Sequence, residues 1–68
     1  MNSYQVRSTN PFYNDVMAQI IAESIVEAIA MAEDNDFDFL MSDIEIVVER
    51  FNVVDQLGKP YPKSITIY

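Results

Sequence analysis

The sequence predicts an α+β fold of β-α-β-β order, in which one amphipathic helix packs on a small three-stranded antiparallel sheet. Apolar residues recur at three- and four-residue spacing through residues 15–33, as one face of a helix requires. Residues 3–8, 44–54 and 64–68 alternate in polarity or concentrate β-branched side chains, which is typical of strands. With 68 residues, half of them hydrophobic, the chain is long enough for one small domain spanning residues 1–68.

The predicted helix over residues 15–33 has an unusually wide apolar face. That face comprises Met17, Ile21, Ile25, Ala28, Ile29 and Ala32, and the other side carries Asp15, Gln19, Glu23 and Glu27. The apolar arc covers roughly 200°, against the ~100° that a surface helix needs to cover a core. The excess indicates either a second contact, with a dimer partner or a target protein, or a tiny domain that uses Ile where a larger one would use Ala.

The predicted strands flank this helix. Tyr4 and Val6 share one face of the strand at residues 3–8. After the helix, Phe37, Phe39 and Leu40 are expected to pack inward from an acidic loop at residues 34–43. The β-branched run at residues 44–54 favours a strand over a short second helix. A turn at residues 55–58, with Gly58 at positive φ, leads to the last strand at residues 64–68, and we expect the last two strands to form a hairpin.

Composition excludes several functional classes. The chain has no Cys and no His, so it lacks disulfides, thiolate metal sites, the usual general base and the usual zinc ligand. It also lacks a Gly-rich phosphate loop, and its four bases are too sparse for a nucleic-acid-binding patch. No apolar run is long enough for a membrane span, and the first residues do not resemble a signal peptide. We therefore expect a soluble cytoplasmic protein, without a cofactor, that is not an enzyme and does not bind nucleic acid or membrane directly.

Acidic residues dominate the charge and concentrate in one region. The formal net charge is −7, and nine of the eleven acids lie within residues 23–49. These nine are Glu23, Glu27, Glu33, Asp34, Asp36, Asp38, Asp43, Glu45 and Glu49. Such a surface favours a basic partner by long-range attraction, or serves solubility alone.

A calcium site is one alternative use of these acids. Asp34, Asp36 and Asp38, with Glu45 at the twelfth position, have the spacing of an EF-hand loop. However, Phe39 stands at the sixth position, where the loop needs Gly for its sharp turn. Glu45 also lies in a run that favours a strand rather than the exit helix.

In size, charge and coarse element order the chain resembles phage-encoded inhibitors of host enzymes, such as anti-CRISPR proteins, nuclease inhibitors and RNA-polymerase inhibitors. The resemblance carries over no individual residue. It implies a non-enzymatic, nucleic-acid-mimicking protein that blocks a basic host protein in the host cytoplasm. The predicted partner-binding residues are Glu23, Glu27, Asp34, Asp36, Asp38 and Asp43 for attraction, with Phe37, Phe39 and Met41 as apolar anchors. The alternative is an assembly module, including a homodimer, that acts through the wide helix face or an edge strand at residues 64–68.

Overall fold

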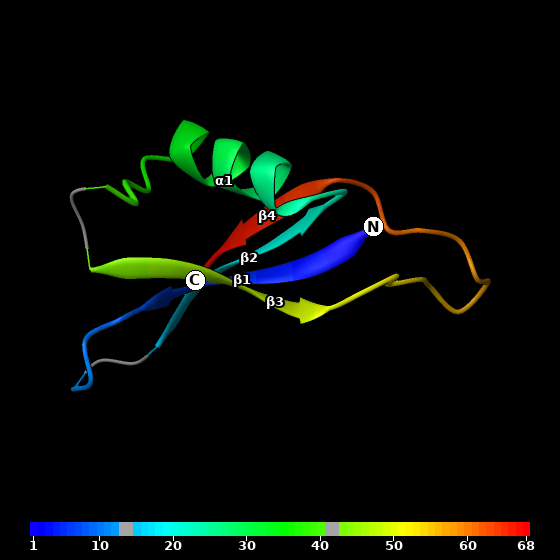
Figure 1. Ribbon diagram of the computed structural model, residues 1–68. Helices are drawn as coiled ribbons and strands as arrows, with labels where there is room; N and C mark the ends of the chain where they lie inside the picture. The colour runs from blue at the N-terminus through cyan, green and yellow to red at the C-terminus, as the bar shows by residue number, and fades with distance from the viewer. Residues whose placement is uncertain (13–14, 41–42) are drawn as a thin grey trace.

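The computed structural model, which describes residues 1–12, 15–40 and 43–68, has the element order β-β-α-β-β. Its strands are β1 (Asn2–Ser8), β2 (Val16–Ala22), β3 (Ile44–Arg50) and β4 (Ser64–Ile67), and helix α1 (Ile25–Asp34) follows β2. The strands form one antiparallel sheet in the order β3-β1-β2-β4, with α1 on one of its faces (Figure 1). The predicted α+β class, with one helix on a small antiparallel sheet, is confirmed.

The predicted helix over residues 15–33 is wrong in its first half. Val16–Ala22 forms β2, which pairs with β1 through registers such as Tyr4↔Ile20 and Val6↔Ala18. Every second residue of this strand is fully buried: Ala18, Ile20 and Ala22 have no exposed surface. Burial in this segment therefore repeats every two residues, as in a strand, and not every three or four residues, as in a helix. The sheet therefore has four strands instead of three, and the β-α-β-β order is corrected.

The predicted hairpin of the last two strands is also wrong. Strands β3 and β4 lie at opposite edges of the sheet, with β1 and β2 between them. The third strand ends at Arg50 rather than at residue 54. Residues 51–63 form an arm that leads from one edge to the other. The predicted turn in this arm is confirmed: Gly58 has φ +76°, and its N–H donates to the Asp55 carbonyl oxygen at 3.0 Å.

The core lies between α1 and the two central strands. Its buried hydrophobic residues are Tyr4, Val6, Ala18, Ile20, Ala22, Ala28 and Ala32. Alanine on both sides of this contact lets the helix approach the sheet closely. Phe37 and Phe39 pack against the core from the segment after the helix, as predicted. Leu40 does not, because 90% of its surface is exposed.

Candidate functional site

The acidic residues divide between the two ends of an elongated molecule. The Cα atoms extend 38 Å along the longest axis. At one end of Figure 1 lie the end of β1, the start of β2, the end of α1 and the start of β3; at the other lie the N-terminus, the start of α1 and the arm. We define the acidic end by the seven acids Asp15, Glu33, Asp34, Asp36, Asp38, Asp43 and Glu45, with the single base Arg7. The mixed end carries the four acids Glu23, Glu27, Glu49 and Asp55 and the three bases Arg50, Lys59 and Lys63.

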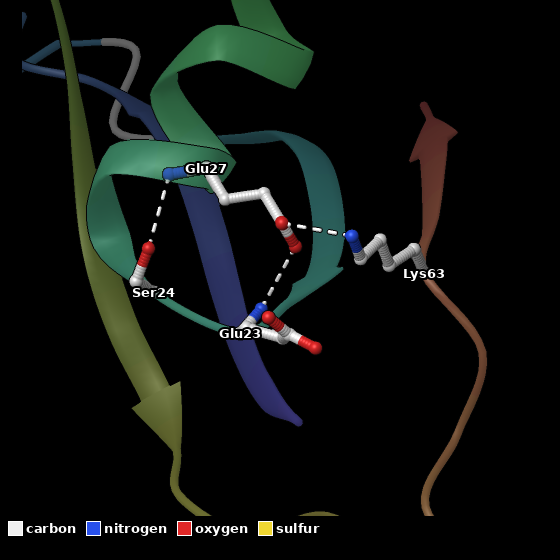
Figure 2. Close-up of polar contacts among 4 residues, drawn as sticks. All are labelled: Glu23, Ser24, Glu27 and Lys63. Carbon is white, nitrogen blue, oxygen red and sulfur yellow. Dashed lines mark hydrogen bonds and ion pairs between the residues drawn. The ribbon is translucent and has the colours of Figure 1, made fainter.

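The start of α1 is built from charges that contact one another. Ser24 has the extended backbone of an N-cap (φ −149°, ψ 165°), and its Oγ accepts a hydrogen bond from the Glu27 N–H at 3.2 Å. The Glu27 side chain turns back: Oε1 accepts from the Glu23 N–H at 3.0 Å, and Oε2 lies 2.9 Å from Lys63 Nζ (Figure 2). This arrangement differs from a capping box, in which the side chain of the third helical residue accepts from the backbone N–H of the N-cap residue rather than from that of the residue before it. Glu27 thereby joins α1, the end of β2 and the start of β4.

These contacts shift two pKa values in the directions that ion pairing requires. The hydrogen bond from the Glu23 backbone lowers the pKa of Glu27, and Lys63 lowers it further. The hydrogen bond to Glu27 raises the pKa of Lys63. Both oxygens of the Glu27 carboxylate thus have partners within the fold. Glu27 is therefore a predicted partner-binding acid whose charge already has a partner of opposite sign within the fold.

At the other end of α1, the backbone holds acidic side chains in solvent. The N–H groups of Asn35 and Phe37 both donate to the Ala32 carbonyl oxygen, at 3.0 and 3.1 Å, which closes the helix. Between them Asp36 adopts a left-handed conformation with φ +69°, and the chain then returns so that Phe37 packs against the core. Asp38 Oδ1 accepts from the Leu40 N–H at 3.0 Å. Asp36 and Asp38 therefore flank a half-buried ring and remain exposed themselves.

The structure brings together some of the predicted partner-binding residues and separates others. Asp34, Asp36, Asp38 and Asp43 lie at the acidic end. Glu27 lies in the first turn of α1 and Glu23 just before the helix, roughly 10 Å or more along its axis from Asp34. Phe37 and Phe39 face the core and hold the segment in place, and Met41 lies outside the described residues. Leu40 is an exposed apolar side chain of this end and lines one hollow with Glu33, Asp36 and Asp38. The sequence predicts that Phe39 and Leu40 both pack inward, and no feature of its pattern indicates that Leu40 is the exposed one of the two.

The calcium alternative gains no support from this geometry. Asp34 ends the helix, Asp36 and Asp38 follow it, and Glu45 lies on β3. Over residues 1–12, 15–40 and 43–68, no three acidic side chains form a group that could hold a metal ion.

No protein-family model, curated protein or solved structure matches this chain. Within the part of the chain that the structure describes, no helix has the length and apolar character needed to cross a membrane.

Proposed function

We propose that the protein is a non-enzymatic binding protein whose acidic end docks on a basic surface of another protein. The observation that carries this proposal is the imbalance between the ends. Seven acids with one base occupy the acidic end, whereas four acids with three bases occupy the mixed end. Because charge of one sign is gathered at one end, the molecule has a direction in which an oppositely charged partner is attracted.

The local structure of the acidic end suits such a contact. Its acids Glu33, Asp34, Asp36 and Asp38 are exposed, so they meet a partner without rearrangement of the core. The packing of Phe37 against the core fixes the segment before binding, which limits the conformational entropy that binding would cost. Exposed Leu40 supplies an apolar contact among the charges, and buried apolar anchors at the centre of an interface carry much of its affinity.

The partner class that fits best is a protein whose own ligand is nucleic acid. A surface that binds phosphates is rich in Lys and Arg, and exposed carboxylates compete for the same side chains. A small acidic protein that occupies such a surface would act as an inhibitor of a nucleic-acid-processing protein, inside the cell where that protein works.

The test compares two double variants with the same change in charge. Asp36→Asn with Asp38→Asn neutralises the acidic end, where Asn tolerates the left-handed backbone at residue 36 and keeps the side-chain acceptor at residue 38. Glu23→Gln with Glu49→Gln removes two charges from the mixed end. Each tagged protein is used to capture partners from a bacterial lysate at low and high salt. The affinity for the captured protein, once purified, is then measured directly.

We expect a basic, nucleic-acid-binding partner whose affinity falls on the order of tenfold in the acidic-end variant and within about twofold in the mixed-end variant. Binding should also weaken with salt, and nucleic acid should compete for the same site. Equal binding by both variants, or a partner insensitive to salt and to nucleic acid, would contradict the proposal.

A second candidate, self-assembly through β4, is favoured by the sheet order. Strand β4 pairs with β2 on one side and forms an edge of the sheet on the other. Its sequence Ser-Ile-Thr-Ile holds no charge and no Pro, the features that protect edges against pairing. A dimer that dissociates on dilution in sedimentation, and that Thr66→Lys abolishes without unfolding the domain, would support it. A monomer at high concentration would rule it out.

A further inference from the structure

A second surface feature, separate from the acidic end, is a cavity on the sheet face opposite α1. Tyr4 and Ile20 face the helix, so the alternation along each strand directs their neighbours Ser3 and Ile21 to the other face. The register aligns Arg50 with Ser3, Ser3 with Ile21, and Ile21 with Ser64. One residue from each of the four strands thus forms a continuous row, and all four line a cavity of about 360 Å³.

The arm at residues 51–63 forms the outer wall of this cavity through Val53, Tyr61 and Pro62. The arm is tied to the N-terminus, because the Val53 N–H donates to the Met1 carbonyl oxygen at 2.8 Å. It also folds on itself through an isolated β-bridge between residues 54 and 60. Within its turn, Asp55 Oδ1 accepts from two backbone N–H groups, at 2.8 and 3.0 Å. The wall is therefore in place before any ligand binds, which favours affinity.

The lining of the cavity includes a hydrogen-bonded carboxylate. Ser3, which is 3% exposed, donates from Oγ to Glu49 Oε2 at 3.0 Å. Gln19 Nε2 donates to Ser3 Oγ at 3.1 Å and to Glu49 Oε2 at 3.2 Å. Two donors thus position one oxygen of the Glu49 carboxylate. The network belongs to the cavity, since all three residues line it.

A β-bulge places opposite charges side by side in the lining of the cavity. The register passes from Ser3↔Arg50 to Tyr4↔Val48, so Glu49 is the extra residue of β3 and has no partner on β1. Consecutive Glu49 and Arg50 therefore both line the cavity instead of alternating between faces. Among the described residues the one ion pair is Lys63 with Glu27, so neither Glu49 nor Arg50 is engaged in a salt bridge.

We propose that this cavity binds a small zwitterion with an apolar body, of the class of α-amino acids with an aliphatic or aromatic side chain. The ammonium group would contact Glu49 and the carboxylate would contact Arg50, as charge-assisted hydrogen bonds favour. The apolar body would lie against Ile21, Val53 and Pro62. The volume lies near the lower limit of ~300–1,000 Å³ for small-molecule sites, which suits a ligand of this size.

The probes are L-leucine and two analogues that each lack one charge: isoamylamine without the carboxylate, and isocaproate without the ammonium. Each is titrated into the ¹⁵N-labelled full chain up to about 20 mM, which covers the millimolar affinity expected of so small a ligand. We expect L-leucine to shift the amide signals of residues 19–21, 49–53 and 61–64. Each analogue should bind about tenfold more weakly or worse.

Matched variants locate the binding charges. Glu49→Gln and Arg50→Gln should each weaken L-leucine binding about tenfold or more. Glu45→Gln is the control for Glu49→Gln, because it makes the same substitution on the same strand but at the acidic end. It should leave the affinity for L-leucine unchanged. The acidic-end double variant at residues 36 and 38 should also bind L-leucine normally, so this inference stands apart from the proposed docking function. No shift of the cavity amides at the highest L-leucine concentration, or equal binding of L-leucine and both analogues, would overturn it.

Discussion

The two ends of the molecule use charged residues in opposite ways. At the mixed end, charged side chains hold the chain together: Glu27 contacts Lys63 and the Glu23 backbone, and Asp55 closes the turn of the arm. At the acidic end, Phe37 and Phe39 anchor the chain by packing against the core, and the neighbouring acids are exposed to solvent, although Asp38 accepts a hydrogen bond from the Leu40 N–H. Glu33 and Asp34 even occupy the last helical turn, where the helix dipole favours cations.

A count of charges therefore does not reveal how the fold uses each of them. Acids near the start of α1 stabilise the fold, and acids near its end oppose it slightly. A cost of this kind is sometimes retained because a charge is needed for binding. Substitutions at the two ends separate these two uses.

The largest effect is expected where an aromatic ring secures the acidic end. Phe37→Ala should lower the free energy of unfolding by about 2 kcal/mol, less than the 3–5 kcal/mol typical of fully buried Phe because Phe37 is half-buried. Urea denaturation would measure this loss. Leu40→Ala is the control, and its 90% exposed side chain should change stability by no more than about 0.5 kcal/mol. Equal losses in both variants would mean that this segment does not depend on the packing of Phe37.

The helix cap at the mixed end gives the next largest effect. Ser24→Ala removes the acceptor for the Glu27 N–H and should cost about 1 kcal/mol of stability by the same measurement. Ser24→Asp, which keeps an acceptor at the cap, should retain most of the stability. A loss in the Asp variant as large as that in the Ala variant would show that something other than capping sets the stability at this position.

The Glu27–Lys63 pair predicts a pH dependence with a definite sign. The pKa of Glu27 is lowered from its ordinary 4.5, so its contribution is present above that value and disappears as the pH falls through the folded-state pKa. The pKa of Lys63 is raised from 10.5, so its contribution is present below that value and disappears as the pH rises through the folded-state pKa. The advantage of the native chain over Glu27→Gln should therefore be full near neutral pH and shrink on acidification. A difference that stays constant down to about pH 3 would contradict this assignment.

Much of this architecture is visible in the sequence, but the point at which strand gives way to helix is not. Met17 and Ile21 continue the helical spacing of the residues after them, while Ala18 and Ile20 fit a strand equally well. Periodicity alone therefore does not decide between a helix and a strand in this segment. The decisive signal is Ser24 followed by Glu27, the pattern of a capping box, which marks where α1 begins.

The candidate sites show the same limit. The exposure of Asp36 and Asp38 follows from composition, but the sequence cannot tell that Lys63 reaches Glu27 across 36 positions. The cavity is less predictable still, because its row takes one residue from each of four strands, and the register that aligns them depends on the sheet order. Residues that meet only through tertiary pairing leave no local pattern.

The smallest predicted effect is also the most direct test of the contrast between the ends. Glu23→Gln and Glu33→Gln make the same chemical change just before α1 and in its last turn. Glu23 is favourable to the helix dipole, so the loss of its charge should lower stability by about 0.3–0.5 kcal/mol. Glu33 opposes the dipole and lies among like charges, so its loss should raise stability by about the same amount.

Both differences should shrink in high salt, because screening weakens interactions between exposed charges. Precise urea midpoints at low and high salt would resolve them. Changes of the same sign at both positions would mean that overall net charge, rather than the place of each acid on the helix, sets its contribution. Opposite signs would show that the fold gains from acids at one end and tolerates them at the other, which is the condition under which a surface of unfavourable charge is retained for a partner.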